Sequence, residues 1–147
     1  MPAIIRVVKG IENSVEIFGN DYNTHDGSGI RDYIHIMDLA SAHIKALEFL
    51  SKKEIFEVFN IGTGNGVSVF ELLKIFEDVS GRKVPIIISP RREGDSSCCF
   101  ADPTKAKKIL NWQSRLDLKE MCLSAWNFSK NHEEFLFKRK KILEKIL

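Results

Sequence analysis

Four charged side chains follow an apolar run in the stretch PRREGDSSCC, residues 90–99. They are Arg91, Arg92, Glu93 and Asp95. Guanidinium groups bind planar oxyanions through paired N–H donors, and a carboxylate accepts hydrogen bonds from hydroxyl groups. Because burying unpaired charges is costly, a hydrophobic core has no use for such a cluster. The stretch therefore predicts either a solvated loop or a site that grips a charged ligand.

Three closely spaced glycines form a second candidate site, in the stretch NIGTGNGVSVFELL. A dinucleotide-binding loop needs the spacing G-x-G-x-x-G and an acidic residue about 20 positions further on. Here the spacing is G-x-G-x-G, position 67 is Val, and Asp78 is too near and falls within a predicted helix. We therefore expect a tight turn that leads into a helix, and no cofactor at this loop.

The three cysteines give no disulfide or zinc framework. Cys98 and Cys99 are adjacent, which disfavours a relaxed disulfide between them, and Cys122 is left over. No His or second cysteine pair stands at ligand spacing, so we expect no metal site. Free thiols are typical of the reducing cytosol, and we expect a cytoplasmic protein.

The elements that position these residues alternate between helix and strand. The sequence predicts strands at residues 14–19, 30–37, 57–62 and 83–89, and helices at residues 38–50, 68–81, 101–110 and 117–131. The stretch PAIIRVVKG is predicted to be a helix or a strand; Pro2 suits a first helical turn, and Gly10 would end it. Asp38 and Asp102 are predicted N-caps, and Ser68 with Glu71 and Asp117 with Glu120 are predicted capping boxes. The fold class is α/β, in one domain.

Composition excludes several classes of function. The chain has 147 residues, 44% of them hydrophobic, which suits one ordinary domain. Its net charge of +2 is too small to indicate nucleic-acid binding. No apolar run approaches the roughly 18 residues of a membrane span. The N-terminal stretch MPAIIRVVKG does not resemble an export signal.

Taken in order, the motifs IFGNDYNTHDGSGIRDYIHIMDLASAH, FNIGTGNGVSVFELL, PRREGD and ADPTKAKKILNW resemble the C-terminal portion of the UDP-glucose 4-epimerase family. These enzymes are extended short-chain dehydrogenases. The resemblance runs over residues 1–131. It implies a small mixed α/β substrate-binding domain, with the Rossmann domain largely missing, that holds a UDP-hexose. Residues 132–147 are predicted to form a basic amphipathic helical tail, either packed back with a solvated charged face or directed at a partner.

The resemblance implies a role for each of seven residues. Arg31 and Arg92 match the two arginines that bind the diphosphate, and Asp95 matches the acceptor for the ribose hydroxyls. Glu16, Ile17 and Phe18 match the segment that lies against uracil, with Phe18 packed on the base. The alternatives are a surface ion pair between Arg31 and Asp32, worth less than about 1 kcal/mol, and an ordinary core role for Phe18. Arg91 and Glu93 are expected to be supporting or solvated.

Cys99 occupies a position that the family places beside the hexose and often fills with Tyr. The smaller thiol predicts a pocket that also admits N-acetylated hexoses, and the alternative is a small neutral filler. Tyr33, His35 and Asp38 are expected to be structural.

Catalysis in this family needs NAD and the pair Tyr-x-x-x-Lys, in which the lysine lowers the tyrosine pKa. Tyr22 is followed four positions later by Asp26, and Tyr33 by Met37, so the chain offers no such pair. The resemblance therefore implies a missing N-terminal NAD-binding half, no NAD bound by this chain alone, no turnover, and an exposed apolar face that favours self-association. Full-length members of the family are commonly homodimeric. The alternative is a non-catalytic nucleotide-sugar-binding or interaction module.

Overall fold

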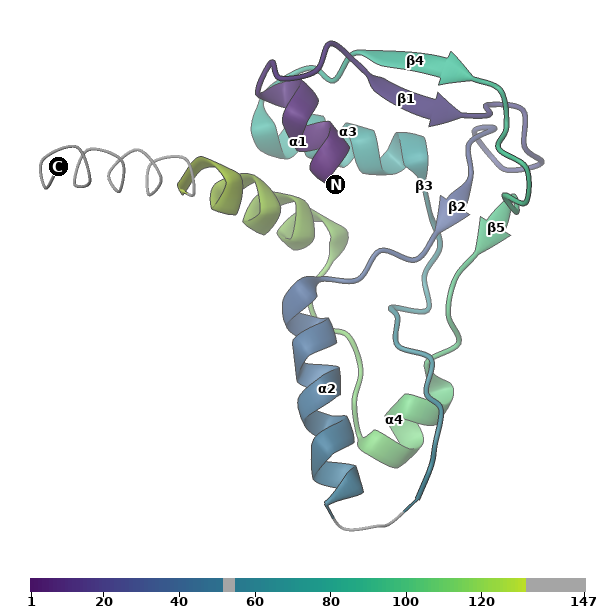
Figure 1. Ribbon diagram of the computed structural model, residues 1–147, viewed down its shortest axis with the longest axis vertical. Helices are drawn as coiled ribbons and strands as arrows, with labels where there is room; N and C mark the ends of the chain where they lie inside the picture. Colours follow the sequence, from purple (N-terminus) through teal and green to yellow (C-terminus); the bar gives the residue numbers. More distant parts are fainter. Residues whose placement is uncertain (52–54, 132–147) are drawn as a thin grey trace, which may run out of the picture.

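The computed structural model describes residues 1–51 and 55–131, which form an upper and a lower lobe (Figure 1). The upper lobe contains α1 (Pro2–Val8), β1 (Val15–Phe18), α3 (Val69–Ser80), β4 (Ile86–Ser89) and a helix over residues 118–131. The lower lobe contains α2 (Ile36–Leu50) and α4 (Thr104–Leu110). The strands β2 (Ile30–Arg31), β3 (Val67–Ser68) and β5 (Cys98–Cys99) join the lobes. The predicted mixed α/β class is confirmed, and the predicted tail at residues 132–147 lies outside the described residues.

Two small sheets bring distant segments together. β1 pairs in parallel with β4, so that Phe18 lies opposite Ser89. In the second sheet the order is β3-β2-β5, with β2 antiparallel to β3 and parallel to β5. Arg31 in β2 therefore lies opposite Cys99 in β5. These pairings place the loop after β4 beside both β1 and β2.

Each lobe has its own apolar core. The upper core surrounds Phe76, which is fully buried and meets Trp126 edge to face at 6.1 Å between ring centroids. Burial of aromatic side chains is among the largest apolar contributions to a domain's stability. The lower core is smaller and consists of Ala42, Ala106, Leu110 and Trp112, with Phe49 and Phe59 packed against it.

Capping residues in the sequence predicted several helix ends correctly. Ser68 and Glu71 form the predicted capping box of α3, and Gly81 ends that helix in the left-handed conformation at a φ of 66°. Asp117 and Glu120 exchange the two hydrogen bonds of a second capping box, at 2.7 and 2.8 Å. Pro2 begins α1 as predicted. Such caps depend on residues three or four apart, so the sequence alone can specify them.

Two of the four predicted strands depart most from the structure. The strand predicted at residues 30–37 ends after Arg31, and His35, not Asp38, caps α2 by accepting the Met37 amide at 3.0 Å. Residues 57–62 form no strand, although they are rich in the branched and aromatic residues that strands favour. A strand needs a neighbouring strand to pair its backbone groups, which the local sequence does not reveal. α4 begins one residue after Pro103, and Asp102 accepts the Thr104 amide at 3.0 Å.

Candidate functional site

A cleft of about 290 Å³ opens where β1, β2 and the loop after β4 meet. Six of the seven residues singled out from the sequence line it. Its lining residues are Glu16, Ile17, Phe18, Tyr22, Gly29, Arg31, Tyr33, Val69, Arg92 and Asp95. Segments that are 60 or more positions apart in the chain thus converge on one concave surface, as small-ligand sites require.

A tight turn presents Arg92 and Asp95 to this cleft. The Asp95 amide donates to the Arg92 carbonyl at 3.3 Å, and Gly94 between them has a φ of 83°. Only glycine adopts that conformation without strain, so the sequence REGD bends sharply there. In β2, the Arg31 side chain is fixed by a hydrogen bond from its Nη1 to the Ile30 carbonyl, at 2.7 Å.

Asp95 lies between the two arginines. Arg92 Nε and Nη2 donate to its carboxylate at 2.9 and 3.3 Å, and Arg31 Nη2 lies 4.0 Å from Asp95 Oδ1. The hydrogen bond with Asp95 raises the pKa of Arg92, which is fully ionised in any case. A guanidinium carries five N–H donors, so both arginines keep donors free for an anion. Two cations facing the same carboxylate are the electrostatic core of the site.

Phe18 forms the aromatic wall of the cleft. Its side chain is half-buried, and the guanidinium of Arg92 lies over its ring at 4.6 Å from the centroid. Cation–π contacts of this kind orient a guanidinium as well as stabilise it. Phe18 therefore lines the cleft and is not among the residues of either core. Glu16, on the same strand, accepts a hydrogen bond from the Ser89 hydroxyl at 2.5 Å.

Cys99 lies outside this cleft. It lines a separate cavity of about 430 Å³ together with Arg31, Asp32, Asn60, Phe100, Ala101 and Asp102. Arg31 belongs to both cavities, so it marks the boundary between them. All three cysteines are free, with Cys98 and Cys99 exposed and Cys122 buried. Burial raises the pKa of the Cys122 thiol to about 11, which keeps it protonated and unreactive.

Tyr22 lines the cleft, and sequence reasoning did not select it. Its side chain is 7% exposed, and its hydroxyl oxygen is buried without a hydrogen-bond partner among the described residues. The guanidinium of Arg91 stacks on its ring at 4.3 Å and is anchored by Asp21 Oδ1 at 2.7 Å. Arg91 therefore packs beside the cleft without lining it. The stretch at residues 20–29, NDYNTHDGSG, is rich in turn-forming residues, so nothing in it indicated the buried ring.

Replacing Tyr22 by Phe removes only the unpartnered hydroxyl. We expect the free energy of unfolding to stay unchanged or to rise by up to about 1 kcal/mol, because no hydrogen bond is lost. Urea denaturation of the chain measures this. The matched control is Ser68→Ala, which removes a hydroxyl that caps α3 at 3.0 Å and should cost about 0.5–2 kcal/mol. Equal losses in both variants would contradict the prediction.

Asp32 organises the glycine loop and is not the partner of Arg31. Its carboxylate accepts hydrogen bonds from the backbone amides of Thr63 (3.0 Å), Gly64 (3.1 Å) and Ala101 (3.2 Å). Burial favours the neutral acid, but these bonds outweigh it and hold the pKa of Asp32 below its ordinary value. Because Asp32 is engaged in this way, the Arg31–Asp32 ion pair considered above is not among the ion pairs of the described residues.

The glycine loop leaves room for the Asp32 carboxylate to pack against it. A Cβ on Gly62 would lie 2.4 Å from Asp32 Oδ2, so only glycine fits there. The loop is therefore closed by a carboxylate, and it offers no cradle of free amides for the pyrophosphate of a dinucleotide.

His35 and Asp38 have structural roles. His35 is buried, and its Nε2 lies 2.8 Å from the Ser124 hydroxyl. Asp38 Oδ2 accepts the amides of Arg115 at 3.0 Å and Leu116 at 2.9 Å. These bonds connect α2 to the segment before the helix at residues 118–131. They satisfy polar groups that would otherwise be costly to bury.

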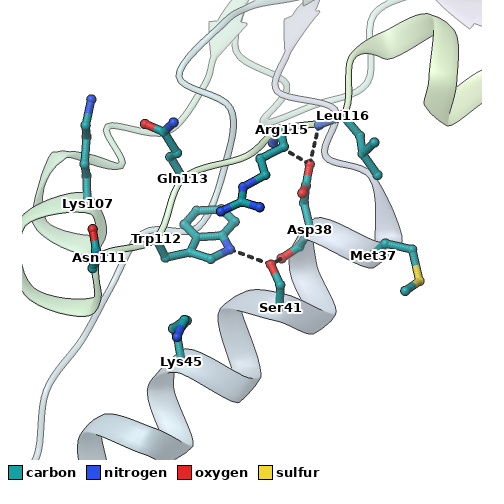
Figure 2. A pocket seen from close by; sticks show the side chains of 10 residues that line it. All are labelled: Met37, Asp38, Ser41, Lys45, Lys107, Asn111, Trp112, Gln113, Arg115 and Leu116. Atoms are coloured by element: carbon teal, nitrogen blue, oxygen red, sulfur yellow. Dashed lines mark hydrogen bonds between the residues drawn. The ribbon is translucent and has the colours of Figure 1, made fainter.

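A larger cavity, of about 600 Å³, lies between α2 and α4 (Figure 2). Its inward polar groups are already used: Trp112 Nε1 donates to the Ser41 hydroxyl at 2.8 Å, and Asp38 holds backbone amides. Figure 2 shows the side chain of Lys107 pointing away from Arg115 and Lys45, so the cations of this cavity do not converge. Its size alone does not make it a ligand site.

Within residues 1–51 and 55–131 we find no cluster of three or more metal-ligating side chains. In the same ranges, no helix has the length and apolarity that a membrane crossing requires.

The family model described as GDP-mannose 4,6 dehydratase matches residues 1–124. Together with the mixed α/β fold and the arginine cleft, this match defines the class: the chain belongs to the family of NAD-dependent nucleotide-sugar epimerases and dehydratases. Relatives that are 42–48% identical to it are UDP-glucose 4-epimerases. The enzyme of Bacillus subtilis (strain 168) is 46% identical over 132 residues, which are 90% of this chain and 39% of that protein.

Solved structures give the same result. UDP-glucose 4-epimerase from Stenotrophomonas maltophila, with bound NAD and formylated UDP-arabinopyranose, matches with a TM-score of 0.86 and 45% identity. The match covers 90% of this chain and 40% of that one. The enzyme from Bifidobacterium longum, in complex with NAD+ and UDP, matches with a TM-score of 0.83 and 41% identity over 88% of this chain and 38% of that one. The chain thus spans about two fifths of these relatives.

Proposed function

We propose that the cleft binds the UDP portion of a UDP-hexose, as the substrate-holding part of a cytoplasmic UDP-glucose 4-epimerase. The observation that carries the proposal is the approach of Arg31 and Arg92 to a single carboxylate from segments far apart in the chain. Two guanidinium groups that face the same carboxylate can also bind the oxygens of two linked phosphoryl groups. Relatives described with bound UDP or a UDP-sugar support the choice of nucleotide.

Different lining residues contact different parts of the ligand. Arg31 and Arg92 hold the diphosphate, and Asp95 accepts hydrogen bonds from the ribose hydroxyls. Phe18 provides a flat apolar surface for the uracil, with Glu16 and Ile17 along the same strand. This arrangement orients the sugar and binds it without reacting with it, since the chain contributes positioning and charge only.

NAD, when bound by the rest of a full-length enzyme, accepts and returns the hydride. In the part of this chain that the structure describes, the Thr63 and Gly64 amides of the glycine loop are held by Asp32 and are not available to NAD. The chain also lacks the Tyr-x-x-x-Lys pair. We therefore expect no conversion of UDP-galactose by this chain alone with NAD, which is also the behaviour of the alternative, a non-catalytic binding module. Homodimerisation, if it follows the family, belongs to the complete enzyme.

Calorimetric titration of the chain with UDP, UDP-glucose and uridine tests the proposal. We expect UDP and UDP-glucose to bind with similar affinity, and uridine to bind at least about tenfold more weakly, because the phosphoryl contacts are charge-assisted. The affinity for UDP should fall as salt rises. Binding of uridine as tight as that of UDP, or no heat with either nucleotide, would refute the assignment.

Cys99 bears on which hexose fits. It lies in the cavity of about 430 Å³ on the far side of Arg31, where a sugar attached to a diphosphate at Arg31 would extend. We expect UDP-GlcNAc to bind the unsubstituted chain, and Cys99→Tyr to abolish that binding while sparing UDP-glucose, because the phenol ring occupies the space that the N-acetyl group needs.

The control for this variant is Cys98→Tyr. Cys98 is the neighbouring exposed cysteine of β5, does not line that cavity, and points to the opposite face of the strand. Calorimetry with both sugars compares the two variants. If Cys99→Tyr leaves the affinities for UDP-GlcNAc and UDP-glucose unchanged, Cys99 is a neutral filler.

A further inference from the structure

Two neighbouring arginines after the end of β4 have different surroundings. Arg92 lines the cleft, with its guanidinium over the Phe18 ring at 4.6 Å from the centroid. Arg91 does not line the cleft, and its guanidinium lies over the ring of Tyr22, in the loop that follows β1. Figure 1 shows the segments after β1 and after β4 side by side at one end of the upper lobe. Arg91 therefore joins the turn that carries Arg92 to the loop after β1.

The Arg91 side chain contacts the loop after β1 at three points. Its Cζ lies 4.3 Å from the centroid of the Tyr22 ring, and its Nε donates to Asp21 Oδ1 at 2.7 Å. Its Nη2 donates to the backbone carbonyl of Asp21. The hydrogen bond from Arg91 lowers the pKa of Asp21, so this carboxylate is ionised at neutral pH. A planar guanidinium can stack on a ring and donate in its own plane, and the three contacts together fix its position and its orientation.

Gly19 leaves the space that these contacts occupy. A Cβ at this position would lie 2.7 Å from Arg91 Cγ and 2.7 Å from Tyr22 Cε2, and the φ of Gly19 is 82°. Residues with a side chain are strained in that backbone conformation. The Gly19 amide donates to the Ser89 carbonyl at 2.8 Å, so the pairing of β1 with β4 continues to the point where the two loops begin. The backbone at the end of the sheet therefore allows Arg91 and Tyr22 to meet.

Few other contacts hold residues 90–96 in place. Their backbone hydrogen bond, from the Asp95 amide to the Arg92 carbonyl, is internal to the turn. The Arg92 side chain donates to Asp95 in the same turn, and Asp95 lies 4.0 Å from Arg31, beyond hydrogen-bond distance. Within the described part of the chain, the hydrogen bonds that tie this turn to a distant segment are those of Arg91. The position of the turn therefore depends on Arg91.

We infer that Arg91 is a positioning residue for nucleotide binding. Anchored on the loop after β1, it holds the turn so that the Arg92 guanidinium lies over Phe18 and faces the cleft. Arg91 does not line the cleft and acts on the ligand through Arg92. A displaced guanidinium cannot offer its paired donors in the productive geometry, and small misplacements of a binding group are costly. The effect of Arg91 on affinity rests on the proposed function, whereas its effect on the Arg92 side chain does not.

Calorimetric titration with UDP tests this inference through a double-mutant cycle. We expect Arg91→Ala to weaken UDP binding by about five- to twentyfold, and Arg91→Lys to weaken it similarly, because lysine keeps the charge but lacks the planar fork. In an Arg92→Ala background, Arg91→Ala should add less than about a twofold loss, since Arg91 acts through Arg92. Unchanged affinity in Arg91→Ala, full affinity in Arg91→Lys, or losses that multiply in the double variant would overturn the inference.

The matched control for the charge and the stacking is Arg82→Ala. Arg82 also lies over an aromatic ring, with its Cζ 5.6 Å from the Trp126 centroid, and its Nη1 donates to the Val8 carbonyl at 2.9 Å. It does not line the cleft. Its removal takes away the same charge and the same kind of contact, and should change the affinity for UDP less than about twofold. A loss as large as that in Arg91→Ala would contradict a specific role for Arg91.

Nuclear magnetic resonance of the chain without nucleotide separates this inference from the proposed function. The signal is the side-chain Nε–H of Arg92, which donates to Asp95 at 2.9 Å, and its absence in Arg92→Lys assigns it. We expect this proton to exchange with water at least about threefold faster in Arg91→Ala, and at an unchanged rate in Arg82→Ala. Equal exchange in all these chains overturns the positioning role, even where UDP binds. If UDP does not bind but the exchange still depends on Arg91, the proposed function fails and the positioning role stands.

Discussion

Replacing Arg31 by Ala should weaken UDP binding by about 10- to 100-fold, and Arg92→Ala should do the same. Hydrogen bonds to charged groups contribute about 1.5–3 kcal/mol each, and about 1.4 kcal/mol corresponds to one order of magnitude in affinity. Loss of Arg31 also leaves Asp95 with one guanidinium instead of two, so the carboxylate repels the diphosphate more strongly. Calorimetric titration of each variant with UDP measures the effect.

The matched control for this loss is Arg115→Ala. Arg115 is an exposed cation at the cavity between α2 and α4, and its backbone amide, which Asp38 accepts, survives the substitution (Figure 2). Its removal subtracts the same charge outside the cleft and should change the affinity for UDP less than about twofold. Arg92→Lys adds a second comparison, because it keeps the charge but loses the fork. Similar losses at all three positions would indicate long-range attraction in place of direct contact.

The sequence predicted those parts of the fold that depend on near neighbours. Ser68 and Glu71 cap α3 because the two side chains need only each other's backbone, and Gly81 ends the helix because it alone accepts the left-handed conformation readily. The strand at Val15–Phe18 was predicted from its alternation and is present. Its partner, β4, follows almost seventy residues later, and the pairing itself could not be read from either segment.

The errors all concern partners that lie elsewhere in the fold. The stretch 57–62 has strand composition, and its side chains even alternate in exposure, yet no described segment pairs with it. The strand predicted from Ile30 stops at Arg31 because β3 and β5 pair with only those two residues. Asp32 was considered as a partner for its neighbour, but three amides from two distant segments occupy it. Tertiary contacts therefore overrode local propensity at each of these positions.

The candidate site was predictable to the extent that the family motifs carry it. Resemblance singled out seven residues, and the fold gathers six of them in one cleft. Composition and spacing alone could not have joined Phe18 to Arg92, since their proximity depends on the parallel pairing of β1 with β4. The stacking of Arg91 on the buried ring of Tyr22 could not be predicted either, since neither residue's local sequence indicates the other.

The largest expected effect on stability comes from Phe76→Ala. Phe76 is fully buried in the upper core, against Trp126 and beside Leu72 and Leu73. Removing a buried Phe ring loses its transfer free energy and leaves a cavity, so we expect a loss of about 3–5 kcal/mol in the free energy of unfolding. For a domain of this size such a loss is a large fraction of the total stability. Urea denaturation followed by tryptophan fluorescence measures the loss, since Trp126 lies in the same cluster.

Phe56→Ala is the matched control, because it makes the same chemical change at a ring that is 90% exposed. We expect it to alter the free energy of unfolding by less than about 0.5 kcal/mol. The two variants together separate the contribution of the upper core from that of an exposed ring, since the first ring is surrounded by the chain and the second is not. Equal destabilisation by the two substitutions would show that burial does not account for the loss at Phe76.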